Sequence, residues 1–343
     1  MNKNGEAEKK QDYRVEKDSI GTKDVPQNVY YGVQSLRAAE NFHITGLNMH
    51  PEIINSLAYI KKAAAITNCE IGMLDKKKAK AIVQACDEIL EGKLHGDFIV
   101  DPIQGGAGTS LNMNANEVIA NRAIEILGGE KGDYSIINPN DDVNCGQSTN
   151  DVIPTAGKMT SLRLLKNLKK ELLRLHKALC AKAKEFDHVI KMGRTQMQDA
   201  VPIRLGQEFN AYSVAVMRDI HRMDRAMEEM CTLNMGGTAV GTGINADEAY
   251  LRRIVPNLVE VSDMEFVQAY DLIDATQNLD PFVAVSGAVK ACAVTLSKIA
   301  NDLRLMSSGP RAGFGEINLP AKQNGSSIMP GKGNPGIPEG GNQ

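Results

Sequence analysis

The sequence is poor in aromatic residues: they make up 4% of its 343 residues, and tryptophan is absent. Proteins that stack nucleic-acid bases on flat side chains need more of them, so a surface of that kind is disfavoured. An excess of one charge sign is also lacking, because the formal net charge is −3. This balance offers no strong attraction for nucleic acid or an anionic membrane, and we expect neither partner.

Cysteine motifs and targeting segments are missing as well. The six cysteines are scattered without a CxxC pair, which predicts neither a zinc cluster nor a disulfide framework. Met1–Gln11 is charged and lacks the apolar core of a secretory signal, so a disordered tail is predicted there. No run approaches the roughly 20 apolar residues that span a bilayer. We expect a soluble, cytoplasmic protein with reduced thiols.

Patterns for nucleotides and metals are not found either. No GxGxxG follows a predicted strand and no Walker loop occurs, so a nucleotide cofactor is not predicted. The chain has six histidines, and none lies in the polar loops described below. This argues against a histidine base or a metal centre. We therefore predict no cofactor and assign no residue to a metal.

Three long segments carry apolar residues at steps of three and four, the spacing of one helix face. They span residues 165–186, 209–230 and 282–306, and in the third the steps alternate strictly. Each predicts a helix of roughly 30 residues, about 45 Å long at 1.5 Å per residue. Helices of that length outreach a small domain, so the stripes predict a long bundle that subunit association completes.

The first part of the chain has shorter predicted elements. They are a strand or hairpin around Tyr13–Ile20 and helices over Pro51–Ile71, from the cap Asp75 to Leu90, and over Asn112–Leu127. Loops are predicted at residues 138–150, 191–205 and 235–275. The change in pattern predicts a tail at 1–11, an N-terminal domain at 12–147 and a helical-bundle domain at 148–343. The predicted fold class is all-α (mainly α).

Four segments are rich in hydroxyls, amides and glycine: Gly108-Thr109 with Asn112 and Asn114, and the loops at residues 146–151, 193–196 and 325–335. Glycine lets backbone N–H groups approach a ligand closely, and donors of this kind suit a small dianion. Each loop alone has a plainer interpretation, because Ser-Thr-Asn before a helix is usually a cap and Gly-Ser-Ser is usually a turn. The residues by themselves leave both interpretations open.

Five segments, in order, resemble blocks of the fumarase/aspartase family, which includes argininosuccinate and adenylosuccinate lyases. Gly325–Pro335 (GSSIMPGKGNP) is similar to the family signature. The other matching blocks are Gly105–Arg122, Gly146–Thr155, Met192–Gly206 and Lys298–Gly313. The resemblance covers nearly everything from about residue 12 onward. It implies a long central helical bundle with a smaller N-terminal domain, and a homotetramer whose sites are each assembled from three subunits.

The resemblance also implies a mechanism. A base removes a proton from the carbon beside the β-carboxylate of a dicarboxylate substrate, which gives an aci-carboxylate before the leaving group departs. Ser326 matches the base, acting as an alkoxide stabilised by loop N–H groups and nearby cations. The positions that match the α-carboxylate site are Thr195, Lys332 and Asn334; those around the β-carboxylate are Ser148, Thr149 and Ser327; those facing the amino group are Thr109, Asn150 and Gln196.

The loop chemistry favours an amino leaving group. Ser148-Thr149-Asn150 is similar to aspartases, where fumarases usually have Ser-Ser-Asn. Gln196 points the same way, because fumarases usually have histidine there and a neutral amide serves poorly as an acid or base for water. The resemblance thus implies reversible deamination of L-aspartate to fumarate. A class II fumarase-type hydratase, converting fumarate to L-malate, and a non-catalytic helical scaffold stay open as alternatives.

A metal activator and two departures from the family complete these expectations. Some relatives respond to a divalent metal such as Mg²⁺, but the sequence shows no ligand cluster for one. Gly333, Gly336, Gly340 and Gly341 stand where the family usually has apolar residues, and each costs roughly 0.5–1 kcal/mol in a helix. The chain ends at Gln343, whereas family members continue. We expect a shortened chain with an incomplete bundle, an exposed apolar stripe on its third long helix and impaired activity.

Overall fold

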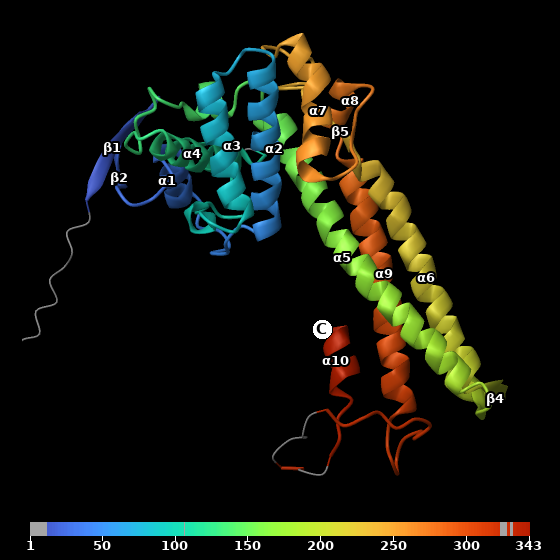
Figure 1. The fold of residues 1–343 in the computed structure, drawn as a ribbon. Coiled ribbons are helices and arrows are strands. Elements are labelled where there is room, and N and C mark those ends of the chain that lie inside the picture. Colours follow the sequence, from blue (N-terminus) through green and yellow to red (C-terminus); the bar gives the residue numbers. More distant parts are fainter. Residues whose placement is uncertain (1–11, 106, 323–327, 330–331) are drawn as a thin grey trace, which may run out of the picture. The chain divides into compact units, whose positions relative to one another are not determined.

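The computed structural model describes residues 12–105, 107–322, 328–329 and 332–343, which are mainly helical (Figure 1). The predicted fold class is confirmed. The chain forms two compact units: residues up to 163 with 230–279, and residues 164–229 with 280–343. The predicted boundary at residue 147 follows the change in sequence pattern, whereas these units follow contacts and return residues 230–279 to the first unit.

The first unit combines short strands with helices that pack face to face. Its elements are β1 (Tyr13–Asp18), β2 (Gly21–Pro26), α1 (Val33–Asn41), α2 (Pro51–Glu70), α3 (Lys76–Leu90), η1 (His95–Asp97), α4 (Thr109–Ile126), η2 (Pro139–Val143), the start of α5 (Thr149–Glu185), β5 (Thr232–Leu233), α7 (Glu248–Ser262), β6 (Val267–Gln268) and α8 (Leu272–Gln277). β1 pairs with β2 antiparallel, and β5 pairs with β6 in parallel. Helix α2 packs against α3 and α7, and α3 packs against α4.

Local signals set the starts of α2 and α3. Pro51 occupies the first turn of α2, and the Nδ1 atom of His50 accepts a hydrogen bond from the Glu52 N–H. Asp75 caps α3 by accepting from the N–H groups of Lys77 and Lys78. A proline at the first turn and a polar cap both satisfy the requirements of a helix start. Both predicted helices are confirmed, with ends within one residue of the prediction.

A buried carboxylate on α4 fixes the start of α1. Glu117 accepts hydrogen bonds from the backbone N–H groups of Gly32, Gln34 and Ser35. Burial raises the pKa of Glu117, and these donors oppose the rise. Position 32 requires glycine, because a Cβ there would lie 2.7 Å from the Glu117 Cδ. The hydrogen bonds explain how a carboxylate is accommodated in the core.

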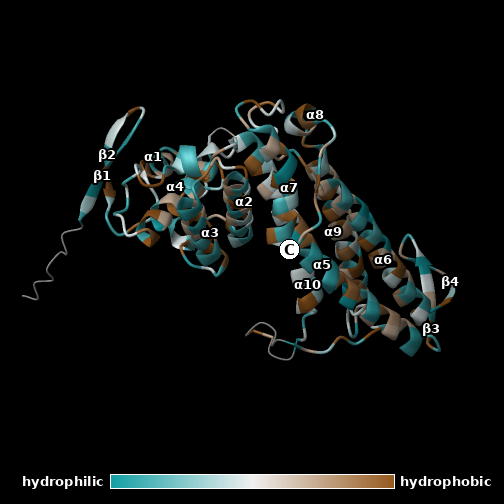
Figure 2. Ribbon diagram, turned by 45° about the horizontal axis from the view of Figure 1, so that its top comes forward, coloured by the Kyte–Doolittle hydropathy of each residue, from teal (hydrophilic) through white to brown (hydrophobic). Residues whose placement is uncertain are grey.

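The second unit is built from three long helices. Its elements are the greater part of α5, then β3 (Ile190–Thr195), β4 (Gln198–Arg204), α6 (Leu205–Met230), α9 (Asp280–Met306) and α10 (Gly336–Asn342). The core contains predicted stripe positions from all three long helices: Leu165, Leu172, Leu179, Val216, Ile220, Met223, Cys292, Ile299 and Met306. Figure 2 shows apolar and polar residues alternating along these helices. The three predicted bundle helices are confirmed.

The predicted loop at residues 191–205 is wrong, because this segment forms a hairpin. β3 and β4 pair antiparallel, with Thr195 opposite Gln198. The two residues between them, Gln196 and Met197, have positive φ angles of 52° and 61°, as in a two-residue type I′ turn. Such turns usually contain Asn-Gly, and without that pair the sequence carries no hairpin signal here.

The predicted loop at residues 235–275 is also wrong over much of its length, because it contains α7, β6 and α8. Asp247 caps α7 by accepting from the Ala249 N–H. Tyr250, Ile254 and Leu258 are buried at intervals of one helical turn. These are ordinary helix signals, but the glycine-rich stretch before them and Pro256 within the helix mask them in the sequence.

Helix α9 bears on two expectations: that the chain has no apolar run of membrane-spanning length, and that the apolar stripe of this helix is exposed. Within the described part of the chain it is the one helix long and apolar enough to cross a membrane by length and composition, which corrects the expectation that the chain has no such segment. Cys292 and Ile299 of its stripe are buried in the bundle core. Val283 and Val294 are 71% and 64% exposed, and they lie off that stripe. The most exposed apolar side chains of α9 therefore lie on another face, while Val289 of the stripe is 37% exposed.

Helix α10 offers a test of the unusual glycines. A Cβ built at Gly340 or Gly341 meets nothing within 4 Å. Replacing both by alanine is expected to raise the free energy of unfolding by roughly 0.5–1 kcal/mol per site, because glycine loses most backbone freedom in a helix. Urea unfolding measures the change, and Gly287→Ala in α9, where a Cβ also meets nothing, is the matched comparison. A gain at residue 287 with none at 340 and 341 would contradict a stable α10.

Candidate functional site

One buried carboxylate holds the start of α5. Asp151 Oδ1 accepts from the Ser148 N–H at 2.9 Å, and its Oδ2 accepts from the N–H groups of Gly236 and Thr238, each at 3.1 Å. The side chain is fully buried, and burial raises the pKa of Asp151 against these donors. Asp151 therefore fixes both the loop that carries Ser148 and the glycine-rich stretch that follows β5.

Asn150 strengthens the same link. Its Nδ2 donates to the Ala239 carbonyl at 2.7 Å, and its own carbonyl accepts from Asn234 Nδ2 at 3.0 Å. The predicted role of Asn150, accepting from a substrate ammonium, uses its Oδ1 atom. The Nδ2 hydrogen bond fixes the rotation of that planar amide and, with it, the direction in which Oδ1 points.

Two predicted substrate-binding residues, Ser148 and Thr149, line one cavity of about 430 Å³. Its walls come from α4, η2, the loop before α5, the first residue of α5 and the stretch after β5: Asn112, Met113, Asn140, Asn144, Gly146, Gln147, Ser148, Thr149, Thr238, Ala239, Ile244 and Asn245. Among these described residues there is no carboxylate, while amides and hydroxyls are plentiful. A cavity of this size and lining suits a small anion.

A lysine that the sequence interpretation missed lies next to this cavity. Lys61 on α2 is fully buried and donates hydrogen bonds to the side-chain amide oxygens of Asn112, Asn144 and Gln147. Burial lowers the pKa of Lys61 to about 7. A signal for it existed, because Lys61 falls four residues after Leu57, on the buried face of α2. A charged residue at a core position of an amphipathic helix is uncommon unless it has partners.

Thr109 opens α4 on the same unit. Gly108 before it has φ of 86°, and a Cβ there would lie 2.9 Å from the Ile153 side chain, so this position requires glycine. Thr109 is exposed, and Asn112, one turn later, donates from Nδ2 to Thr149 Oγ1 at 3.4 Å. The elements that carry Thr109 and Thr149 are therefore joined through Asn112.

Thr195 and Gln196 lie exposed at the tip of the β3–β4 hairpin, in the second unit. The hairpin is fixed by Glu316, whose carboxylate pairs with Arg194 and, at 3.1 Å, with Lys191. The Arg194 guanidinium also lies over the Phe314 ring, 4.1 Å from its centre. These cations hold the pKa of Glu316 below its usual range, with Arg194 the largest cause. A fixed hairpin presents the two predicted side chains in a defined position.

The remaining predicted residues lie toward the end of the chain. Lys332 and Asn334 are exposed in the segment before α10, and Asn334 borders an apolar hollow with Leu303 and Leu319. Ser326 and Ser327 lie outside the described residues. The structure thus brings Ser148 and Thr149 together in one cavity, while Thr195, Gln196, Lys332 and Asn334 belong to the other compact unit.

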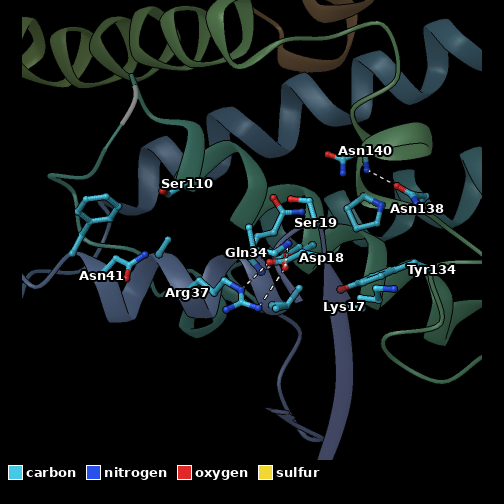
Figure 3. A pocket seen from close by; sticks show the side chains of 16 residues that line it. Lys17, Asp18, Ser19, Gln34, Arg37, Asn41, Ser110, Tyr134, Asn138 and Asn140 are labelled. Carbon is cyan, nitrogen blue, oxygen red and sulfur yellow. Dashed lines mark hydrogen bonds and ion pairs between the residues drawn. The ribbon is translucent and has the colours of Figure 1, made fainter. Parts of the chain in front are cut away.

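A separate cavity of about 550 Å³ lies between α1, the β1–β2 turn and η2, and Figure 3 shows its lining. Arg37 Nε donates to Asp18 at 2.8 Å across one wall, and Asn138 caps η2 on another. The cavity is lined by none of the predicted substrate-binding residues. The described residues also contain no cluster of three His, Cys, Asp or Glu side chains that could hold a metal ion.

Known proteins resemble this chain closely. The aspartate ammonia-lyase of Bacillus subtilis (strain 168) is 58% identical over 328 residues, which cover 96% of this chain and 69% of that protein. The crystal structure of fumarate lyase:delta crystallin from Brucella melitensis bound to cobalt superposes with a TM-score of 0.94 at 51% identity, covering 96% and 72% of the two chains. Recombinant class II fumarase from Schistosoma mansoni gives a TM-score of 0.93 at 36% identity, covering 96% and 73%.

The fold is that of a helical-bundle protein, and its cavity at Ser148 and Thr149 is lined by neutral hydrogen-bonding groups. The profile of the family described as Lyase matches residues 21–343. The chain belongs to this lyase family, the fumarase/aspartase family that its five sequence blocks indicate. The predicted family and its helical-bundle fold are confirmed.

Proposed function

We propose that the chain catalyses the reversible elimination of ammonia from L-aspartate to give fumarate. The strongest support is sequence identity: the aspartate ammonia-lyases of Bacillus subtilis and Escherichia coli (strain K12) are 58% and 49% identical to this chain, over 96% and 95% of its length. The cavity at Ser148 and Thr149 supports a dicarboxylate substrate, because its described lining offers neutral donors and no carboxylate that would repel an anion.

In the proposed mechanism Ser326 accepts the proton from the carbon beside the β-carboxylate. The electron pair of that C–H bond moves into the carboxylate and forms the aci-carboxylate. When the pair returns to form the carbon–carbon double bond, the neighbouring C–N bond breaks and ammonia leaves. Ser148, Thr149 and Ser327 donate to the β-carboxylate, where the extra charge develops. Donors aimed at developing charge contribute more in the transition state than in the ground state.

The other proposed contacts hold the substrate in place. Thr195, Lys332 and Asn334 bind the α-carboxylate, and a lysine ammonium gives that contact its charge. Thr109, Asn150 and Gln196 surround the amino group, which leaves as ammonia. Two held carboxylates and a surrounded amine fix the C–H and C–N bonds relative to the base, which lowers the entropic part of the barrier.

We propose further that the protein is a cytoplasmic homotetramer, with each site assembled from three subunits, and that the reaction needs no cofactor. The exposed valines of α9 support association, because subunit contact would cover apolar surface that the single chain leaves in water. A divalent cation such as Mg²⁺ stays a proposal for an activator without an assigned site.

Fumarate formation from two substrates tests the proposed function. The chain is incubated separately with L-aspartate and with L-malate, and fumarate is followed by the ultraviolet absorbance of its conjugated double bond. We expect fumarate from L-aspartate alone. Fumarate from L-malate alone would assign a fumarase-type hydratase. No fumarate from either substrate would mean that the chain as given is inactive, either as the impaired shortened enzyme expected from its sequence or as a non-catalytic scaffold.

A further inference from the structure

A buried ammonium lies directly behind the cavity at the start of α5. Lys61 Nζ donates to Asn112 Oδ1 and Asn144 Oδ1 at 2.8 Å and to Gln147 Oε1 at 2.9 Å. These three amides come from α4 and from the loop before α5, and all three line the cavity, whereas Lys61 does not. Lys61 therefore makes no direct contact with a ligand in the cavity, and its hydrogen bonds reach the ligand only through the amides.

The ammonium determines which way the amides point. It has three N–H donors and no acceptor, so each amide must turn its oxygen toward Nζ and its NH₂ group away. Gln147 Nε2 then donates to the carbonyls of Val143 and Cys145 at 3.0 and 3.2 Å, and Asn144 Nδ2 donates to the Gln147 carbonyl at 3.1 Å. The loop immediately before Ser148 is held by hydrogen bonds that depend on this orientation.

The third amide reaches Thr149, a predicted β-carboxylate ligand. Asn112 Nδ2 donates to Thr149 Oγ1 at 3.4 Å and to Asn144 Oδ1 at 3.2 Å. A hydroxyl oxygen that accepts such a bond keeps its own proton for another acceptor. Because Thr149 lines the cavity, that proton is available to an anion bound there.

The positive charge of Lys61 has no directly bonded counter-charge. Its acceptors among the described residues are neutral amides, and the titratable groups that face it are Asp151 of α5 and Cys86 of α3. A buried cation surrounded by neutral acceptors is stabilised by an anion placed nearby, such as a carboxylate in the adjacent cavity.

We propose that Lys61 is a positioning residue for the carboxylate-binding loop, acting through Asn112, Asn144 and Gln147. Its ammonium orients the three amides, holds the segment that leads into Ser148, and makes the Thr149 hydroxyl a donor toward the substrate's β-carboxylate. The identity of the bound carboxylate rests on the proposed function. The effect of Lys61 on the order of the loop does not rest on the proposed function, so each proposal can fail while the other stands.

Amide hydrogen exchange of the whole chain tests the order of the loop. We compare wild type with Lys61→Met and with Lys62→Met, a matched control on the same helix that pairs with Asp87. In K61M the N–H groups of residues 144, 147 and 148 should exchange about tenfold faster or more, because hydrogen bonds to a charged group are lost. K62M should match wild type. Equal exchange in K61M and wild type would overturn the proposal.

A second measurement needs no variant. A neutral amine has two N–H donors, so it cannot donate to all three amide oxygens once the pH exceeds the pKa of Lys61, about 7. In wild type we expect the ratio of the amide exchange rate of the loop to that of α3 to rise by about tenfold between about pH 6 and about pH 9. A ratio that stays constant over this range would overturn the proposal, whether or not K61M folds.

Kinetics with L-aspartate test the route to the substrate. K61M should lower kcat/KM by about a hundredfold, the usual effect of a misplaced binding group. Thr149→Val should lower it similarly and leave the exchange of residues 144 and 147 unchanged, which separates loss of the donor from loss of loop order. A Thr149→Val variant with wild-type kcat/KM would overturn the route through Thr149. An inactive wild type would contradict the proposed function, and the exchange results would then decide the role of Lys61.

Discussion

Replacing Ser326 by alanine is expected to lower kcat for fumarate formation from L-aspartate by about 10²–10⁴-fold, the usual contribution of a group that transfers a proton in the transition state. The alanine methyl cannot accept the proton, while Lys332 and Asn334 still bind the α-carboxylate. KM should therefore change little, because binding in the ground state keeps its main contacts. Steady-state kinetics of the purified variant measure both constants.

The neighbouring serine provides the control for that experiment. Ser327 is proposed to donate one hydrogen bond to the β-carboxylate, so Ser327→Ala should lower kcat/KM by only about 10–100-fold, as expected for one bond to a charged group. Urea unfolding of both variants should match wild type. If Ser326→Ala kept roughly a tenth or more of the wild-type kcat, a serine base would be incompatible with the result.

Replacing Asp151 by alanine is expected to lower the free energy of unfolding by about 3–5 kcal/mol, because the N–H groups of Ser148, Gly236 and Thr238 lose their buried acceptor. The loop that carries Ser148 and Thr149 would also lose its attachment to the stretch after β5. Urea unfolding measures the first effect, and the slope of the unfolding free energy against urea concentration should be the same in the variant and in wild type. Asp151→Asn keeps one acceptor oxygen and should be destabilised less.

The pH dependence of the same variant checks the cause. Burial raises the pKa of Asp151 above its unfolded value, so the contribution of this group to stability is fully present below the unfolded pKa and declines as the pH rises through the folded pKa. The difference between wild type and Asp151→Ala should shrink over that rise. A difference that is constant with pH, or a loss below about 1 kcal/mol, would show that Asp151 is not the main support of the loop.

The helical framework could be predicted because its signals are local. Pro51 and Asp75 mark helix starts, and the stripes in residues 165–186, 209–230 and 282–306 repeat the period of a buried face over many turns. The β3–β4 hairpin could not, since Gln196 and Met197 adopt a turn that most sequences fill with asparagine and glycine. Helix α7 was obscured because Pro256 lies inside it.

The candidate site was predictable only in part. Ser148, Thr149 and Asn150 lie beside one another in the chain, so a short motif contains them, and the structure places the first two in one cavity. Lys61 and Asp151 act through partners far away in the sequence, such as Asn144 for Lys61 and Thr238 for Asp151. Long-range hydrogen bonds of this kind leave no periodic signal, and only the folded chain reveals which buried charge meets which amide.

The most direct test of the account is product analysis with ¹⁵N-labelled L-aspartate, in which nuclear magnetic resonance quantifies fumarate and labelled ammonium. Elimination of ammonia predicts fumarate and labelled ammonium in equal amounts, formed by the wild-type chain and about 10²–10⁴-fold more slowly by Ser326→Ala. The reverse experiment, fumarate with labelled ammonium, should give labelled L-aspartate because the reaction is reversible. Fumarate appearing from L-malate without any release of labelled ammonium from L-aspartate would contradict the account.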